Sequence, residues 1–164
     1  GLHPVDSITI SDVERALAIL NADVDEGVWR LPTEAEWEIA CRAGTSTSWW
    51  FGEDGGDLGR ASWYSANAGI STCVVGQKEP NPWGFHDMLG NVREWCSDAW
   101  LPSHDGRPRD GSPAEGDDRW RPARGGAWMC ESLSCRASSR VAMDPESRSD
   151  AVGLRLAWIP SLVG

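Results

Sequence analysis

The sequence predicts a small α+β domain that is rich in loops, and three observations lead to this fold class. Two helix-start patterns follow each other within residues 11–44, and no later segment has helical periodicity. Eighteen glycines and ten prolines among 164 residues indicate many turns. Short segments within residues 91–97 and 153–158 alternate in polarity and predict a small twisted antiparallel sheet. No linker or repeat interrupts the chain, so we expect a single domain over residues 1–164.

The first elements can be placed from residue patterns. Residues 4–10 predict a short strand or an extended entry. Ser11 and Glu14 have the spacing of a capping box, which predicts a first helix. Its expected inward positions are Val13, Ala16, Leu17 and Leu20.

A second capping box, Thr33 with Glu36, predicts a second short helix that Gly44 ends. We expect Ala35 and Ile39 to face the core on this helix, with Trp37 and Ala40 as further candidates. Beyond it, residues 73–76 are the only strand predicted before residue 91, and residues 102–121 read as a surface loop. In the segment after Gly90, Glu94 shares a side with Val92, so this carboxylate needs a buried partner.

Charge and composition exclude several classes of function. The net charge is −10 and basic residues do not cluster, which disfavours nucleic acid and anionic membranes as partners. No apolar run is long enough to cross a membrane, and Gly1 opens no signal peptide, although a leader could have been removed. Eleven tryptophans predict a core built around indole rings whose N–H groups seek acceptors. The five cysteines are expected to be buried thiols with at most one or two disulfides.

Four motifs occur in a fixed order along the chain: R-L-P-T-E-A-E-W-E at 30–38, N-P-W-G-F-H-D-M-L-G-N-V-R-E-W at 81–95, R-G-G-A-W at 124–128 and G-L-R-L-A at 153–157. Together they resemble the formylglycine-generating-enzyme-like (sulfatase-modifying factor) branch of the C-type lectin fold. The resemblance implies that fold for nearly the whole chain. It also implies a strand and a helix before residue 1, so we expect the scaffold to be trimmed or closed differently here.

Within this branch, the C-terminal part is most similar to variable proteins of diversity-generating retroelements. The resemblance implies a non-catalytic ligand-binding protein whose variable-region-like segment is 128–155. Fixed residues would hold the backbone, and the arginines among them suit this because a guanidinium fork binds carbonyls and carboxylates. These scaffold residues are Trp128, Arg136, Arg140, Arg148 and Arg155. The positions expected to contact ligand are Cys130, Ser134, Ser139, Val141, Asp144, Ser147, Ser149, Asp150 and Ala151. The Trp-rich turns at 49–63 are a possible extension of the same face.

Two catalytic branches of the family offer alternatives. The copper-dependent oxidases convert a cysteine of sulfatases to formylglycine, and Cys130 and Cys135 have the spacing of their Cu(I)-binding pair. The neighbouring residues differ, since Ala127 and Glu131 stand where the oxidases have serine and histidine. The iron-dependent sulfoxide synthases need a histidine cluster, whereas His3, His86 and His104 lie in unrelated contexts.

The resemblance also implies a structural calcium site in residues 87–94. Its ligands would be the side chains of Asp87 and Glu94 and the carbonyls of Gly90 and Val92, which are hard oxygen donors suited to Ca²⁺. The alternative is that Glu94 pairs with an inward arginine and binds no metal. A copper ion is expected only if the oxidase interpretation is right.

The partner is expected to be a protein or a surface ligand, which the sequence does not name. Cell surface, virion or secreted locations are favoured slightly over the cytoplasm.

Overall fold

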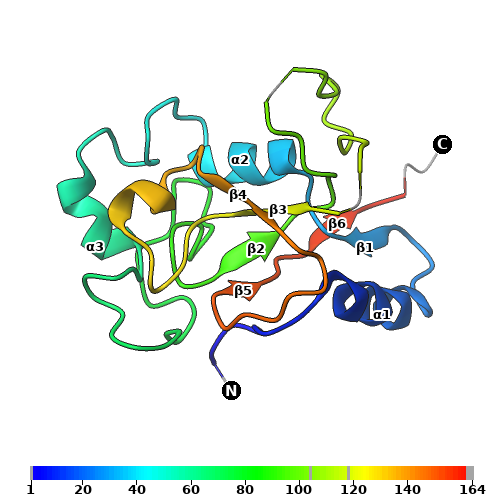
Figure 1. The fold of residues 1–164 in the computed structure, drawn as a ribbon, viewed down its shortest axis with the longest axis horizontal. Helices are drawn as coiled ribbons and strands as arrows, with labels where there is room; N and C mark the ends of the chain where they lie inside the picture. Colours follow the sequence, from blue (N-terminus) through cyan, green and yellow to red (C-terminus); the bar gives the residue numbers. More distant parts are fainter. Residues whose placement is uncertain (1, 104, 118, 162–164) are drawn as a thin grey trace.

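The computed structural model describes residues 2–103, 105–117 and 119–161, and it confirms the predicted α+β class. Figure 1 shows the sheet in the middle of the molecule, α2 along its upper side, and α1 near the β1–β6 pair. The helices are α1 (Ile10–Asn21), α2 (Glu34–Arg42) and the one-turn α3 (Leu58–Ala61), with 3-10 turns η1 (Gly55–Asp57) and η2 (Ser132–Cys135). In the described part of the chain, no helix has the length and apolarity needed to cross a membrane.

The strands form two small sheets. The larger one has the order β4-β3-β2-β5, with β2 at Arg93–Trp95, β3 at Arg121–Arg124, β4 at Arg140–Met143 and β5 at Val152–Gly153. Its β3–β4 and β2–β3 pairs are antiparallel, as expected, but β5 runs parallel to β2. The second sheet pairs β1 (Val28–Arg30) with β6 (Ala157–Ile159) in antiparallel register.

Helix α1 begins earlier than predicted. Thr9, in extended conformation, is the N-cap, and it exchanges hydrogen bonds with Asp12 in a capping box. Ser11, the predicted cap, lies inside the helix and donates its hydroxyl to Glu146 at 2.6 Å. Only the register of the cap was wrong, because Thr9 and Asp12 have the same spacing as the predicted pair. As a result Ile10 and Val13 are buried, while Ala16 and Leu20 are exposed.

Helix α2 confirms the predicted cap and the inward candidate Trp37, but not the inward positions predicted for Ala35 and Ile39. Thr33 and Glu36 form the capping box. Glu34, Trp37 and Cys41 face the core, whereas Ala35 and Ile39 are exposed. The helix turns this face inward because Glu34 binds arginines inside the molecule, as described below.

Two further predictions about the middle of the chain were wrong. Residues 73–76 are an irregular segment that ends in a turn at Val75 and Gly76, and not a strand. The Asn91 side chain holds this segment by accepting a hydrogen bond from Cys73 N at 2.9 Å. Strands β1, β3 and β4 were not predicted. They are short, and their neighbours in the sheet come from distant parts of the sequence.

The core is divided between two clusters, each organised by tryptophan. One contains Trp37 together with Met88 and Leu89, and the other contains Trp95 with Ile10 and Val13. The Trp37 indole donates to Glu94 at 2.7 Å and the Trp95 indole to the Ile8 carbonyl at 3.1 Å. All five cysteines are free thiols, four of them buried and Cys73 half-buried.

Candidate functional site

The segment after β3, residues 125–155, is supported by two groups of ion pairs. The first group surrounds the carboxylate of Glu34. Its carboxylate, 2% exposed, accepts two hydrogen bonds from Arg140, at 2.9 and 2.8 Å. Arg107 donates to it at 2.5 Å, and Arg124 lies 3.7 Å away. Burial alone would raise the pKa of the Glu34 carboxyl, but the hydrogen bonds and charges of these arginines outweigh it and lower the pKa. Glu34 is therefore held ionised under the segment.

Arg124 and Arg140 connect the Glu34 carboxylate to the segment after β3. Arg124, 2% exposed, also pairs with Glu38 and donates to the Ser139 carbonyl at 2.7 Å. The Arg140 guanidinium stacks over the Trp100 ring, with 3.9 Å to its centroid. Strand β4 is thus fixed from below by two cations whose counterion belongs to helix α2.

The second buried pair joins Glu94 to Arg155. The two side chains form a fork with hydrogen bonds of 2.9 and 2.7 Å, and Arg155 also donates to the His86 carbonyl at 2.9 Å. Burial opposes the charge on Arg155, but the facing Glu94 raises the pKa of the guanidinium above its usual value. Of the two partners considered for Glu94, a calcium ion or an inward arginine, the structure thus contains the arginine, Arg155.

Three of the predicted calcium ligands, Asp87, Val92 and Glu94, line a cavity of about 490 Å³, whereas Gly90 does not line it. Asp87 accepts from Gly76 N at 2.7 Å through Oδ2, while its buried Oδ1 has no hydrogen-bond partner among the described residues. That oxygen fits a cation. Glu94 fits less well, because Arg155 already neutralises it. The described residues contain no group of three or more His, Cys, Asp or Glu side chains that could hold a metal.

The remaining scaffold residues hold backbone at the surface. Arg148 pairs with Asp12 at 2.6 Å and donates to the Ser7 carbonyl at 2.9 Å, which fastens the segment to the start of the chain. Trp128 donates its indole N–H to the Asp150 carbonyl at 3.3 Å. Arg136 is exposed and donates to the Leu133 carbonyl at 2.9 Å.

We use the name display face for the side chains of residues 129–152 that are not buried. Figure 1 shows this segment crossing one side of the molecule through η2 and β4 to β5. Of the positions expected to contact ligand, the exposed ones are Asp144 and Asp150, and the half-buried ones are Ser134, Ser139, Val141, Ser147 and Ser149. Cys130 and Ala151 do not belong to this face, because both are buried in the first core cluster. Sequence reasoning missed that the chain turns inward at Cys130, whose N–H bonds the Ala127 carbonyl at 2.9 Å.

The two cysteines of the oxidase alternative lie in the same core cluster. Cys130 Sγ accepts a hydrogen bond from Arg93 at 3.0 Å. Burial, with a contribution from the nearby Cys130, raises the pKa of the Cys135 thiol to about 12. Two sulfurs could hold Cu(I) here only if both lost their protons.

The histidines do not form a cluster in the described structure. His3 bonds the Thr72 hydroxyl at 3.1 Å and His86 the Lys78 carbonyl at 2.8 Å, while His104 lies outside the described residues.

The sequence interpretation missed three residues of the site: Glu34, Arg124 and Arg93. Glu34 and Arg124 belong to the first and third motifs, so the motifs themselves were a signal. Arg93 belongs to the second motif, but its place beside the display face depends on the parallel β2–β5 pairing, which the motif did not predict.

Comparison with known proteins agrees with this geometry. A family model for the sulfatase-modifying factor enzyme 1-like domain matches residues 1–159. Treponema denticola variable protein 1 superposes with a TM-score of 0.87 and 29% identity, over 98% of this chain and 72% of that one. PvdO from Pseudomonas aeruginosa superposes with a TM-score of 0.88 and 31% identity, over 96% of this chain and 62% of that one.

Curated relatives include the formylglycine-generating enzyme of Mus musculus, 31% identical over 145 residues, which cover 78% of this chain and 38% of that enzyme. The serine/threonine-protein kinase pkn1 of Chlamydia pneumoniae is 34% identical over 134 residues, which cover 78% of this chain and 20% of the kinase. The chain thus spans less than half the length of either relative. The expected C-type lectin-like fold is confirmed, and the chain belongs to the family of sulfatase-modifying factor enzyme 1-like (formylglycine-generating-enzyme-like) domains.

Proposed function

We propose that the protein is a non-catalytic ligand-binding protein and that its display face contacts the ligand. The observation that carries this proposal is the separation of the segment into a fixed underside and a free outer side. Arg124, Arg140 and Arg155 fix the underside through Glu34 and Glu94. The outward side chains could be exchanged without breaking any of these ion pairs.

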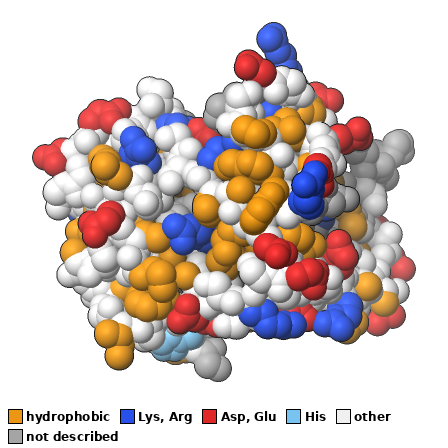
Figure 2. All heavy atoms as spheres, viewed as in Figure 1, with side chains coloured by type: hydrophobic (Ala, Val, Ile, Leu, Met, Phe, Trp, Pro, Cys, Tyr) orange, Lys and Arg blue, Asp and Glu red, His pale blue; other side chains and the backbone are white. Residues whose placement is uncertain are grey.

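The composition of the display face suits a protein or surface ligand. Met129 and Leu133 are 49% and 60% exposed, so both apolar side chains are accessible to a ligand. Figure 2 shows hydrophobic side chains gathered on this side of the molecule, with basic and acidic side chains set among them. A mixed surface with apolar anchors is typical of protein-recognition sites.

We propose further that the face is diversified. Support comes from the ungapped framework spacing and from the similarity to Treponema denticola variable protein 1. Sequencing around the gene tests this directly. We expect a reverse transcriptase gene and a near-copy of the stretch that encodes residues 128–155, differing at adenines. A neighbourhood with neither would refute diversification, although binding by an invariant face would survive.

The second candidate function is a copper-dependent formylglycine-generating oxidase that acts on a cysteine of sulfatases. Its support is the placement of Cys130 and Cys135 in one cluster and the similarity to the mouse enzyme. Incubation with copper and a cysteine-containing sulfatase peptide tests it by mass spectrometry. Aldehyde product that disappears in Cys135→Ser would establish the oxidase and overturn the non-catalytic proposal.

A calcium ion at Asp87, Gly90, Val92 and Glu94 is also proposed, as a structural cofactor. Its support is the unpartnered Oδ1 of Asp87. In the competing arrangement, Glu94 pairs with Arg155 and binds no metal. The effect of calcium on the melting temperature of the wild type and of Asp87→Asn distinguishes the calcium site from this arrangement.

A further inference from the structure

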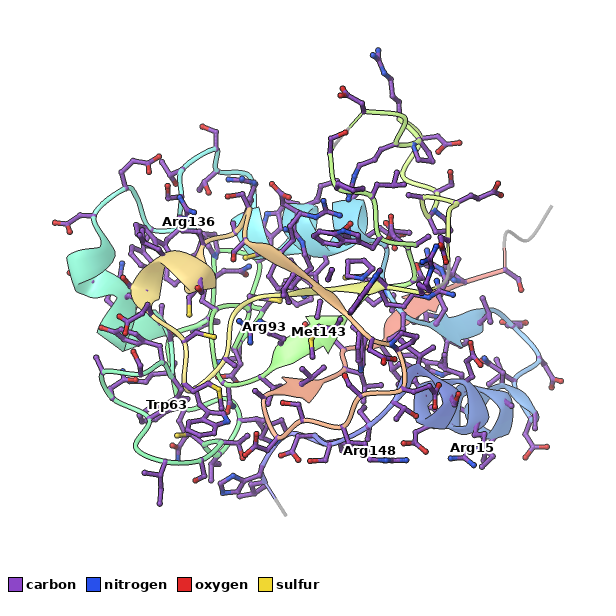
Figure 3. All side chains as sticks on the ribbon, viewed as in Figure 1. Arg15, Trp63, Arg93, Arg136, Met143 and Arg148 are labelled. Atoms are coloured by element: carbon purple, nitrogen blue, oxygen red, sulfur yellow. The ribbon has the colours of Figure 1, made fainter. Side chains whose placement is uncertain are left out.

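Arg93 is the first residue of β2, and its side chain leaves the sheet on the side opposite to Glu94. Successive side chains of a strand alternate between faces. Glu94 is 4% exposed and points to one side of the core, while the opposite side carries the fully buried Trp95. Arg93 shares that side but lies at the end of the strand, where it is half-buried and reaches the surface. In Figure 3 the Arg93 side chain lies in the middle of the face, between Arg136 at one end and Arg148 at the other.

The Arg93 guanidinium has no acidic partner among the described residues. It donates to Cys130 Sγ at 3.0 Å, and sulfur is a weak acceptor. By contrast, Arg107, Arg124, Arg140 and Arg155 all bind carboxylates. The other N–H groups of the Arg93 side chain have no hydrogen-bond acceptor among the described residues and are therefore available to a ligand.

Three chain segments meet at the backbone that carries Arg93. The Arg93 backbone N–H donates to the Ala151 carbonyl at 2.8 Å. The Trp128 N–H bonds the Asn91 carbonyl at 2.8 Å, and its indole bonds the carbonyl of Asp150, next to Ala151. Residues 128–130 and 150–151 are parts of the variable-region-like segment, so an arginine from outside that segment lies at its centre.

We propose that Arg93 binds a carboxylate of the ligand, and this inference rests on the proposed binding function. A guanidinium offers parallel N–H donors that match a carboxylate, and such pairs are strong when partly shielded from water. Glu131 and Asp150 are exposed on the same segment, and the protein carries a net charge of −10. These negative charges disfavour a polyanion as the ligand, so the carboxylate that Arg93 binds would be a single group. Trp128, half-buried, and Met129, exposed, directly precede Cys130, which the Arg93 guanidinium contacts.

NMR titration of the full chain tests the inference with three small probes. N-acetylglutamate α-amide carries a side-chain carboxylate, N-acetylglycine carries a C-terminal carboxylate, and N-acetylglutamine amide is neutral. We expect the carboxylate probes, at constant ionic strength, to shift the Arg93 Nε–H signal and the amides of Cys130 and Ala151 saturably. The neutral probe should not shift them. The carboxylate probe that binds more tightly identifies the source of the ligand's carboxylate.

Variants separate a specific site from general attraction to arginine. Arg93→Gln should weaken carboxylate binding by about tenfold or more, as for a central arginine anchor. Arg109→Gln is the control, since it removes an exposed arginine outside the display face and its scaffold and should leave binding unchanged. If Arg93→Gln does not fold, Arg93→Lys keeps the charge without the fork and should still bind several-fold more weakly. The inference would be overturned if the carboxylate probes caused no shifts, if the neutral probe caused the same shifts as they do, or if the Arg93 variants bound the carboxylates as tightly as the wild type.

The outcome is distinct from that of the proposed function. If the gene neighbourhood holds the reverse transcriptase and the near-copy but the carboxylates leave Arg93 unshifted, only the carboxylate inference falls. If the carboxylates bind at Arg93 and the neighbourhood holds neither, only diversification falls.

Discussion

Replacing Glu34 with glutamine tests whether the buried charges support the display face. The substitution keeps the size of the side chain but removes the counterion of Arg140 and Arg107, and weakens the field on Arg124. Glu34 is 2% exposed, so water cannot replace the lost charge. Removing one partner of a buried ion pair costs about 3–5 kcal/mol. For a chain of this size, that lowers the melting temperature by about 6–20 °C.

The assay is urea unfolding followed by tryptophan fluorescence, with calorimetry to measure the melting temperature. The matched control is Glu79→Gln, which breaks the exposed pair between Glu79 and Arg60. Such a surface pair contributes about 0–1 kcal/mol, so the control should barely change stability. If Glu34→Gln lost less than about 1 kcal/mol, the reasoning that the arginines need this carboxylate would be refuted.

Three other outcomes are expected. The pKa of the Glu34 carboxyl is lowered from its usual 4.5, so the stability that its charge contributes should be complete above pH 4.5 and be lost as the pH falls through the lower pKa of the folded state. The free energy of unfolding, measured between neutral and acid pH, should therefore fall less steeply in Glu34→Gln than in the wild type. Gly126→Ala should destabilise the protein by about 1–3 kcal/mol more than Gly69→Ala. Both glycines have positive φ, but a Cβ at Gly126 would lie 2.6 Å from Cys135 Sγ, whereas a Cβ at Gly69 would meet no atom within 4 Å. If the calcium proposal is right, millimolar calcium should raise the melting temperature of the wild type, and Asp87→Asn should abolish the rise.

Each of these has an outcome that contradicts it. Parallel pH profiles for Glu34→Gln and the wild type would show that another carboxylate governs acid unfolding. Equal losses in the two glycine variants would mean that the thiol moves aside at no cost. An equal rise with magnesium, or in Asp87→Asn, would exclude a specific calcium site at this cavity and leave Arg155 as the partner of Glu94.

Local features of the fold could be predicted because neighbouring residues determine them. The Thr33–Glu36 cap is an example, since both partners lie within one helical turn. The same locality explains the error at α1, where two overlapping cap patterns were available and only tertiary contacts chose between them. Ser11 bonds Glu146 across the molecule, which leaves Thr9 to cap the helix.

The candidate site could be predicted only in part. The sequence named Arg140 and Arg155 as scaffold, but not their counterions, which lie 106 and 61 residues away along the chain. It also placed Cys130 and Ala151 on the surface, because spacing along a loop does not tell which side chains turn inward.

The sequence by itself determined the family, the loop-rich α+β class and the order of motifs, since each depends on residue types at short spacing. The tertiary structure was needed to show which face of α2 is buried, that β5 runs parallel to β2, and that Arg93 has no acidic partner among the described residues. The physical reason is that a buried charge takes its partner from anywhere in the folded chain. The inward face of α2 followed the arginines that meet Glu34, and not the positions of its aliphatic side chains.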